Sequence, residues 1–435
     1  MLPILTQSLW RDEAFSVLLA EKNPLEIIRL TIQDTTPPLH YILLHYWMLL
    51  FGNGEVATRS LSLFFHVLTA ITVFFIARKL IRLSFAQILL PFVVLLNPFL
   101  LQYAFEARPY SLLAFLTVLA VYLVLINRNL LAGIVLTLGI LTHNFGVFNF
   151  TAFAVWWLYA NRSRLSIKEG LGIMGFPLLT ILLWGSVIWN QWTKVAEGFW
   201  IKQTTSSIFL HSFEQYTRGD LSYPIQPMLY TITLILTFFA FSYWVWKKIE
   251  EDTKPILLLF FLLILPTLIT YLISALFAPI YHERYLIATV PVLILITGYS
   301  LYKLYHANPN VRSALIAFIA IYTVLLIQAS EQIIAATTKP AINWGVGQIL
   351  SKAQSGDFIV PESTLNFLET KYYVKKSGSD IPVLAYQPDG KIPFYLGTVL
   401  FEPQEIITEM PKNRRVWQLK SDGGYELITT YRTGN

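Results

Sequence analysis

Residues 59–80 read RSLSLFFHVLTAITVFFIARKL, a mostly apolar run that starts at an arginine and ends beside Arg78 and Lys79. A helix needs about 20 mostly apolar residues to cross the hydrocarbon core of a bilayer. This stretch has that length, and basic residues at its ends suit the membrane surfaces. It predicts a transmembrane helix, and similar runs recur along most of the chain.

The composition also points to a chain that lies mainly in a membrane. Hydrophobic residues make up 55% of the sequence and charged residues 13%, whereas soluble domains are about one quarter charged. Two short runs, 130–142 and 145–160, are either separate spans or one broken pair. The candidate spans are 59–80, 85–103, 111–126, 130–142, 145–160, 171–189, 228–246, 255–277, 285–304 and 313–328. They predict a polytopic α-helical membrane protein with about 10–11 transmembrane helices.

Basic residues occupy alternate loops between these spans. They follow the first, third, fifth, seventh and ninth spans, as Arg78, Lys79, Arg82, Arg128, Arg162, Arg164, Lys168, Lys247, Lys248, Lys254, Lys303 and Arg312. Short loops rich in Lys and Arg stay in the cytoplasm. We therefore expect a multi-pass protein of the plasma membrane, with the first residues, the turn at 143–144 and the loop at 281–284 outside. The net charge of +6 then needs no nucleic-acid partner.

Two parts of the chain differ from the spans. Residues 37–51 are apolar but too short to cross upright, so we expect a juxtamembrane or re-entrant helix there, beside a short amphipathic helix after Asn23-Pro24. Residues 331–435 are polar and mixed. We divide the chain into a transmembrane part, 1–330, whose first outer loop is 10–58, and a small extracytoplasmic α/β domain, 331–435. The domain's predicted elements are strands at 358–360, 383–385 and 416–419 and a helix at 364–373.

The start of the chain is unusual for a membrane protein. Only Met1 to Leu9 precede the first charged residues, which is too few for a signal peptide or a span. Either a short tail is translocated directly, or the protein starts further upstream with one more helix. We favour the second interpretation.

Three acidic residues, Asp12, Glu13 and Asp34, fall close together on the predicted outer face. Acids at the start of a helix often serve as solvated caps that interact with the helix dipole, which would explain an isolated pair. In a chain with so few charges, three acids on one face favour a functional role. A carboxylate there can act as a general base or bind a divalent cation, and Asp34 is the candidate metal ligand.

Two arginine-tyrosine sequences open spans on the same face: Arg108-Pro109-Tyr110 and Arg284-Tyr285. Arg and Tyr both favour the membrane interface as anchors. An arginine also presents a fork of N–H groups that fits phosphate oxygens, so the functional interpretation is a site for a lipid phosphate.

His143, His282 and Glu283 are candidate substrate or metal contacts on this face. A lone histidine at the end of an apolar helix is more often hydrogen-bonded within a bundle than a ligand, and two neighbouring ligands are a weak metal signal. Arg218 and Asp220, in a long loop, suit contacts with an acceptor.

Other chemistries find no support in the sequence. The chain has no cysteine, hence no thiolate nucleophile or thiolate metal site. No Walker loop, dinucleotide glycine fingerprint or H-E-x-x-H sequence occurs, which argues against a nucleotide cofactor.

Several motifs, taken in order, resemble the GT-C superfamily of integral membrane glycosyltransferases. They are residues 9–14 (LWRDEA), Asp34 with Pro37-Pro38-Leu39, residues 47–62, and Ala107-Arg108-Pro109-Tyr110. The similarity is closest to the branch of protein O-mannosyltransferases and aminoarabinose transferases. It covers the first third of the chain and continues more loosely through 141–143 and 283–286.

The resemblance implies an enzyme that moves a hexosyl or pentosyl group from a polyprenyl-phosphate donor to an acceptor hydroxyl outside the cytoplasm, with inversion. The acceptor is a lipid, a glycan or a protein. In that family the acid that matches Asp12 is the general base, with Glu13 as its companion. The acid that matches Asp34 lies near the donor phosphate or a divalent cation. Arg108 and Arg284 fall where cationic residues hold the donor phosphate, together with Tyr110 and Tyr285.

One departure from the family concerns Thr35-Thr36, which stand where relatives often carry Lys or His. The alternative function is a transporter or flippase of a lipid-linked or small polar substrate. It predicts charges at mid-membrane and two matching halves. The charges lie at span ends and no halves match, which favours the transferase. A polytopic scaffold would leave the acids and arginines without a role.

Overall fold

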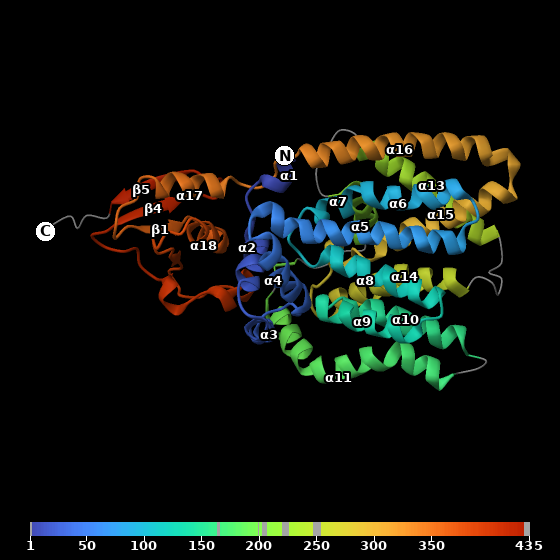
Figure 1. Cartoon of the computed structure of the whole chain (residues 1–435), viewed down its shortest axis with the longest axis horizontal. Coiled ribbons are helices and arrows are strands. Elements are labelled where there is room, and N and C mark those ends of the chain that lie inside the picture. Colours follow the sequence, from blue (N-terminus) through green and yellow to red (C-terminus); the bar gives the residue numbers. More distant parts are fainter. Residues whose placement is uncertain are drawn as a thin grey trace. The chain divides into compact units, whose positions relative to one another are not determined.

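The computed structural model describes residues 2–162, 166–198, 200–201, 207–219, 226–246 and 254–429. Contacts divide the chain into two compact units, whose elements are labelled in Figure 1. One unit comprises Met1–Thr35, Tyr41–Arg59 and Ala336–Asn435, and the other comprises Thr36–His40 and Ser60–Ala335. Asp220, predicted with Arg218 to contact an acceptor, lies outside the described residues.

The larger unit is built from apolar helices packed side by side. Each of the ten predicted spans contains a helix: α5 (Glu55–Leu80), α6 (Ser84–Leu96) with α7 (Pro98–Ala104), α8 (Tyr110–Leu125), α9 (Asn129–Thr142), α10 (Gly146–Ala160), α11 (Ile167–Glu197), α13 (Gln226–Trp246), α14 (Lys254–Leu276), α15 (Thr289–Ala307) and α16 (Arg312–Ala335). The loops hold α12 (Ile208–Arg218), η2 (Glu283–Leu286) and η3 (Pro309–Val311). The prediction of a polytopic helical protein is confirmed.

Only some of these helices are long enough for a full crossing. Four helical stretches of the described chain are long and apolar enough to cross a membrane: α5, Ile167–Ala196, α14 and Pro309–Ala335. The pair α6 and α7 bends by 57° and makes a fifth, broken span. The bend falls at Asn97, whose side chain caps α7 while Pro98 opens that helix, because a proline at the first position needs no N–H partner. Other predicted spans are shorter apolar helices, including α8, α9 and α10.

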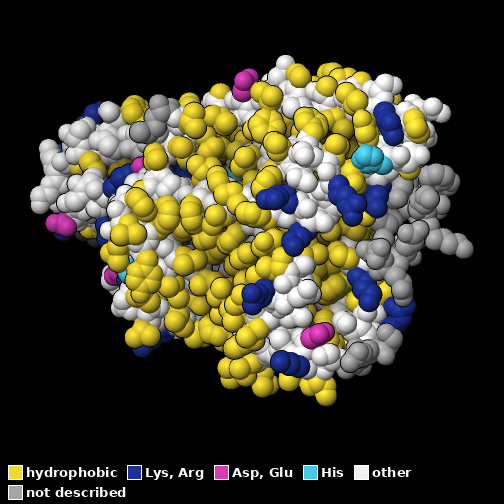
Figure 2. All heavy atoms as spheres, turned by 45° about the vertical axis from the view of Figure 1, so that its right-hand side comes forward, with side chains coloured by type: hydrophobic (Ala, Val, Ile, Leu, Met, Phe, Trp, Pro, Cys, Tyr) yellow, Lys and Arg dark blue, Asp and Glu magenta, His cyan; other side chains and the backbone are white. Residues whose placement is uncertain are grey.

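The surface of this unit suits a bilayer. Figure 2 shows hydrophobic side chains over much of one face and Lys and Arg side chains gathered on one side of it. Leu182, Leu183 and Phe238 are among the large apolar side chains that are mostly exposed. In lipid such side chains meet acyl chains rather than water, and the backbone is satisfied within the helices. The protein is therefore an integral, multi-pass membrane protein.

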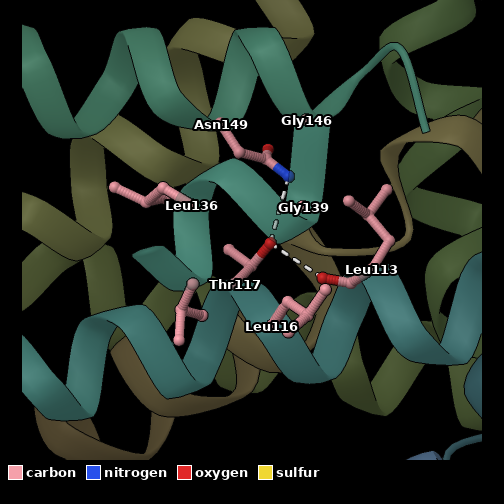
Figure 3. Close-up of a pocket in the computed structure, with 8 residues that line it drawn as sticks. Leu113, Leu116, Thr117, Leu136, Gly139, Gly146 and Asn149 are labelled. Atoms are coloured by element: carbon pink, nitrogen blue, oxygen red, sulfur yellow. Dashed lines mark hydrogen bonds between the residues drawn. The ribbon is translucent and has the colours of Figure 1, made fainter. Parts of the chain in front are cut away.

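Helices α8, α9 and α10 meet at a small cavity with one polar side (Figure 3). Asn149 donates through Nδ2 to Thr117 Oγ1 at 3.1 Å, and that hydroxyl donates to the carbonyl oxygen of Leu113 at 2.9 Å. Gly139 and Gly146 also line the cavity. A Cβ atom at Gly146 would overlap the carbonyl oxygen of Gly139, so the glycine allows the two helices to approach closely.

Substitution of Gly146 by Ala is expected to destabilise the helical unit by about 1–3 kcal/mol, as overpacking commonly does. The added methyl group meets backbone, which cannot rotate away. Thermal unfolding in detergent would measure the effect. Gly175→Ala is the matched control, because a Cβ there has nothing within 4 Å. Equal midpoints for the two variants would contradict this account of the contact.

The other unit joins the first outer loop to the C-terminal segment. Its helices are α1 (Pro3–Thr6), α2 (Arg11–Ala20), α3 (Pro24–Gln33), α4 (Leu39–Phe51), α17 (Ile342–Leu350) and α18 (Phe367–Lys376), and its strands are β1 (Phe358–Pro361), β2 (Ala385–Tyr386), β3 (Ile406–Ile407), β4 (Arg415–Leu419) and β5 (Tyr425–Thr429). β1 pairs parallel to β4, β4 pairs antiparallel to β5, and β2 pairs parallel to β3. The predicted strands and helix are present, and α17, β3 and β5 were not predicted.

Helix α2 forms part of the core of this unit. Phe15 and Leu19 of α2 pack in one hydrophobic cluster with Phe367 and Tyr372 of α18. Gly397, at φ 76°, lies against the Phe15 ring, where a Cβ atom would overlap it. The predicted boundary at residue 330 separated segments that these contacts join. The packing of α2 against α18 could not be predicted from the sequence, because nearly all of α2 is buried and its pattern has no clear apolar face.

Candidate active site

Asp12 occupies the first turn of α2. Arg11 donates through Nε to Asp12 Oδ1 at 3.0 Å, and the Ser16 hydroxyl donates to the Asp12 carbonyl oxygen at 2.9 Å. The Asp12 side chain is 14% exposed. The Asp12 side chain is thus held by its neighbour while part of it stays accessible, as a general base requires.

Glu13, the next residue, is fully buried and bound to Arg59. Arg59 donates through Nε to Oε1 at 2.8 Å and through Nη2 to Oε2 at 2.7 Å, and both side chains are 0% exposed. Arg59 also donates to the carbonyl oxygens of Gln7 (2.7 Å) and Ser8 (2.8 Å). The Glu13 carboxylate further accepts the Trp10 N–H at 3.3 Å. Glu13 therefore supports the turn that carries Asp12 from inside the unit.

Asp34 ends α3 as its C-cap residue and is 7% exposed. Its backbone N–H donates to the Leu30 carbonyl oxygen at 3.0 Å. Among the described residues, no three His, Asp or Glu side chains gather in a way that would hold a metal ion. The donor set around Asp34 therefore does not by itself fit a cation site.

Arg108 lies in the turn between α7 and α8 in the helical unit. Its carbonyl oxygen accepts from Ser62 Oγ of α5 at 3.2 Å, and its side chain is largely buried. Its Nη2 donates to the Tyr110 hydroxyl at 3.3 Å, and the guanidinium lies 5.5 Å from the Tyr110 ring centre. The turn thus holds the side chains of Arg108 and Tyr110, both predicted site residues, at the start of α8.

Arg284 and Tyr285 lie in η2, before α15. The Arg284 guanidinium lies 5.0 Å from the ring centre of Trp200 and 5.5 Å from that of Tyr285. His282 Nδ1 accepts the Arg284 N–H at 3.4 Å. Burial, then the charges of Arg284 and His211, lowers the His282 pKa to about 3, so this imidazole is neutral near pH 7.

His143 connects the two arginine-tyrosine sequences. Its ring centre lies 5.1 Å from that of Tyr285 and 6.0 Å from that of Tyr110. Burial, and then the charges of Arg108 and Arg284, lowers the His143 pKa to about 3. Both guanidinium charges therefore act on one neutral ring. We call Arg108, Tyr110, His143, Arg284 and Tyr285 the arginine cluster.

The orientation of the His143 ring follows from its backbone neighbour. Nδ1 accepts the Phe145 N–H at 3.2 Å, so the proton of the neutral ring is on Nε2. The arginine cluster thus combines two cations with an imidazole N–H donor and two phenol groups, which are all groups that bind phosphate oxygens.

Glu283 lies at the border of the arginine cluster. Its carboxylate is 3.5 Å from His282 Nδ1 and 3.8 Å from His211 Nε2 of α12. Nearby, burial raises the Tyr281 pKa to about 12. Glu283 thus contacts α12, a helix in a segment that was predicted only as a long loop.

Sequence reasoning missed several residues of these sites. His40 is buried, and burial, then the charge of Arg108, lowers its pKa to about 3. Arg59 was part of a family motif but had no assigned role. Trp200 and His211 carried no signal, since single aromatic or histidine residues in loops are common.

The fold defines the class: this is a polytopic membrane protein, and its fold is similar to that of solved structures. No protein-family model matches the chain, and no curated protein matches it. Among solved structures, the chain is similar to ArnT from Cupriavidus metallidurans in the apo state, with TM-score 0.62 and 11% identity over 95% of this chain and 90% of that chain. It is also similar to that ArnT bound to undecaprenyl phosphate, with TM-score 0.63 and 12% identity over 96% and 90%. At these identities the similarity establishes the fold.

Proposed function

We propose that the protein transfers a sugar from a polyprenyl-phosphate donor to an acceptor hydroxyl on the extracytoplasmic face of the plasma membrane. The observation that carries the proposal is the arginine cluster, in which Arg108 lies over Tyr110, Arg284 lies over Tyr285, and the His143 ring contacts both tyrosine rings. Two guanidinium groups with hydroxyl and N–H donors suit a phosphate. The similarity to an ArnT bound to undecaprenyl phosphate supports a lipid phosphate in particular.

The proposed reaction is a single displacement. Asp12 takes the proton of the acceptor hydroxyl while the hydroxyl oxygen bonds to the anomeric carbon of the donor sugar. The bond from that carbon to the phosphate oxygen breaks, and its electron pair leaves with the lipid phosphate. Arg108 and Arg284 stabilise the growing charge. Attack opposite the leaving group inverts the anomeric centre.

The other predicted residues take supporting roles in this proposal. Glu13 acts as the companion of Asp12 through its buried bond with Arg59 rather than on the substrate. Asp34, in the same first loop, contacts the donor phosphate or a cation, but no step is assigned to a metal ion because its donor set is incomplete. His282 and Glu283 contact the sugar or the acceptor, whether that is a lipid, a glycan or a protein.

The proposed orientation follows from the basic residues. Arg78 and Lys79 at the end of α5 and Arg128 after α8 are exposed, whereas Arg108 at the start of α8 is buried in the arginine cluster. The ends of helices that carry exposed Lys and Arg are the cytoplasmic ends in most membrane proteins. The arginine cluster then faces the opposite side.

The proposal is tested with membranes from cells that produce the protein, supplied with a radiolabelled polyprenyl-phosphate sugar. We expect label in a covalent product that is absent from membranes without the protein. Uptake of label into sealed vesicles without a covalent product would instead identify a transporter.

Replacing Arg284 by Ala is expected to lower kcat/KM for the donor by about 10²–10³-fold, because one donor to the developing charge is lost. Lys should restore only part of the rate, since it lacks the planar fork. Arg312→Ala is the matched control, because Arg312 also lies over a tyrosine, 5.1 Å from the Tyr305 ring centre, but outside the arginine cluster. Comparable losses in both variants would argue against a phosphate site.

A further inference from the structure

Residues 7–9, which we call the lead-in segment, lie between α1 and α2 and belong to no helix or strand. Side chains from distant parts of the chain bind its backbone. Arg59 donates to the carbonyl oxygens of Gln7 at 2.7 Å and of Ser8 at 2.8 Å. The C-terminal segment of the same unit, Ala336–Asn435, supplies further contacts.

The C-terminal segment binds the first two residues of the lead-in segment through their side chains. Gln7 Oε1 accepts the backbone N–H of Thr338 at 2.8 Å. The Ser8 hydroxyl donates to Asn343 Oδ1 at 2.7 Å, and the Asn343 N–H donates back to Ser8 Oγ at 3.0 Å. Because Ser8 and Asn343 bond in both directions, this contact fixes position as well as distance.

Tyr373 of α18 holds the third residue of the lead-in segment. Its hydroxyl accepts the backbone N–H of Leu9 at 2.7 Å, and the bond is buried. Leu9 and Tyr373 also belong to one hydrophobic cluster, in which Leu9 is fully buried and Tyr373 is 6% exposed. A buried N–H group that loses its partner is costly, so this bond fixes where the lead-in segment lies against α18.

The lead-in segment sets the position of the turn that carries Asp12. Trp10 follows Leu9 and is the N-cap residue of α2, and its N–H donates to Glu13 Oε2 at 3.3 Å. Asp12 lies on this first turn, between the two bonded positions. The turn is therefore held at Leu9 on one side and at Glu13 on the other.

We propose that Tyr373, together with Asn343, is a positioning residue for the transfer reaction. The two side chains fix the lead-in segment, and hence the turn from which Asp12 reaches the acceptor hydroxyl. The inference rests on the proposed function and extends it to the C-terminal segment, for which the sequence predicted no part in the chemistry. Neither residue touches the substrate in this proposal, because both act through the backbone that precedes Asp12.

The experiment measures kcat, donor KM and thermal unfolding in detergent for Tyr373→Phe, with the labelled-donor assay. Phe keeps the ring in the core but lacks the hydroxyl that accepts the Leu9 N–H. We expect kcat to fall about 10-fold, because a small misplacement of a catalytic group slows the reaction strongly. The donor KM should stay close to wild type, since the donor phosphate is assigned to the arginine cluster.

Tyr372→Phe is the matched control on the same helix. The Tyr372 ring centre lies 4.8 Å from that of Tyr373, and its hydroxyl donates to the Asn53 carbonyl oxygen at 2.7 Å. This variant also loses one hydroxyl and one hydrogen bond, but the bonded residue lies between α4 and α5. We expect a similar fall in the midpoint of unfolding, with kcat at the wild-type value. Equal losses of kcat in the two variants would refute the positioning role, because they would reflect a general loosening of the core.

The outcomes separate this inference from the proposed function. If Asp12→Asn is inactive but Tyr373→Phe keeps the wild-type kcat, the positioning role is refuted and the transferase stands. If membranes with the wild-type protein form no labelled product, the proposed function fails and the role of Tyr373 fails with it. Should Tyr373→Phe fold poorly, Ser8→Ala decides, because it removes the hydroxyl bound to Asn343. A folded Ser8→Ala variant with lower kcat and unchanged donor KM supports the inference, and one with wild-type kcat refutes it.

Discussion

Asp12→Asn is expected to slow sugar transfer by about 10²–10⁴-fold, the usual contribution of a positioned general base. The amide has nearly the same size as the carboxylate, but it cannot take the acceptor proton. Its oxygen can still accept from Arg11 Nε, which lies 3.0 Å from Asp12 Oδ1, so the turn should keep its structure. The rate is measured in membranes with radiolabelled donor, at saturating acceptor.

The control for this variant is Asp380→Asn, an exposed acid in the same unit. It should transfer sugar at the wild-type rate. Donor binding by Asp12→Asn should also remain, because the phosphate is assigned to the arginine cluster. Wild-type transfer by the Asp12 variant would remove the catalytic role of this residue.

Arg59→Met, in α5, is expected to destabilise strongly the unit that contains the first outer loop. It leaves the Glu13 carboxylate buried without its cation, and removing one partner of a buried ion pair commonly costs about 3–5 kcal/mol. The backbone carbonyls of Gln7 and Ser8 also lose a donor. We expect a lower midpoint of thermal unfolding in detergent, faster proteolysis within residues 1–20, and loss of transfer.

A double variant tests whether the loss of stability comes from the bond between Glu13 and Arg59. Glu13→Gln with Arg59→Met removes both charges, so its loss of stability should be smaller than the sum of the two single losses. Arg29→Met serves as the control, because Arg29 is exposed on α3. Strict additivity of the two single effects would show that the bond between Glu13 and Arg59 contributes little.

The helices themselves could be predicted from the sequence because crossing a membrane is a local property. Residues 59–80 are helical in α5 since each apolar segment must satisfy its own backbone in lipid. The lengths were less predictable: the predicted span 85–103 is broken at Asn97 into α6 and α7, and α11 extends beyond the predicted span 171–189 at both ends. α17 and β5 were missed because short, mixed segments carry weak periodicity.

The candidate site was predicted only as a set of residues. The arginine cluster joins residues that were predicted separately, from different loops of the chain. Distances in the structure separate the roles of the two neighbouring acids, Asp12 and Glu13. Glu13 looked equivalent to Asp12 in sequence, yet its bond with Arg59, 46 positions away, places it inside the unit.

The sequence alone determined that this chain enters a membrane many times and carries acids and arginines at span ends, because hydrophobicity and charge act segment by segment. Tertiary structure decided which of those groups meet. Arg108, His143 and Arg284 converge only when three helix ends pack together, and Phe15 meets Phe367 only when α18 packs on α2. Such contacts depend on the packing of segments distant in the chain, and no local pattern encodes them.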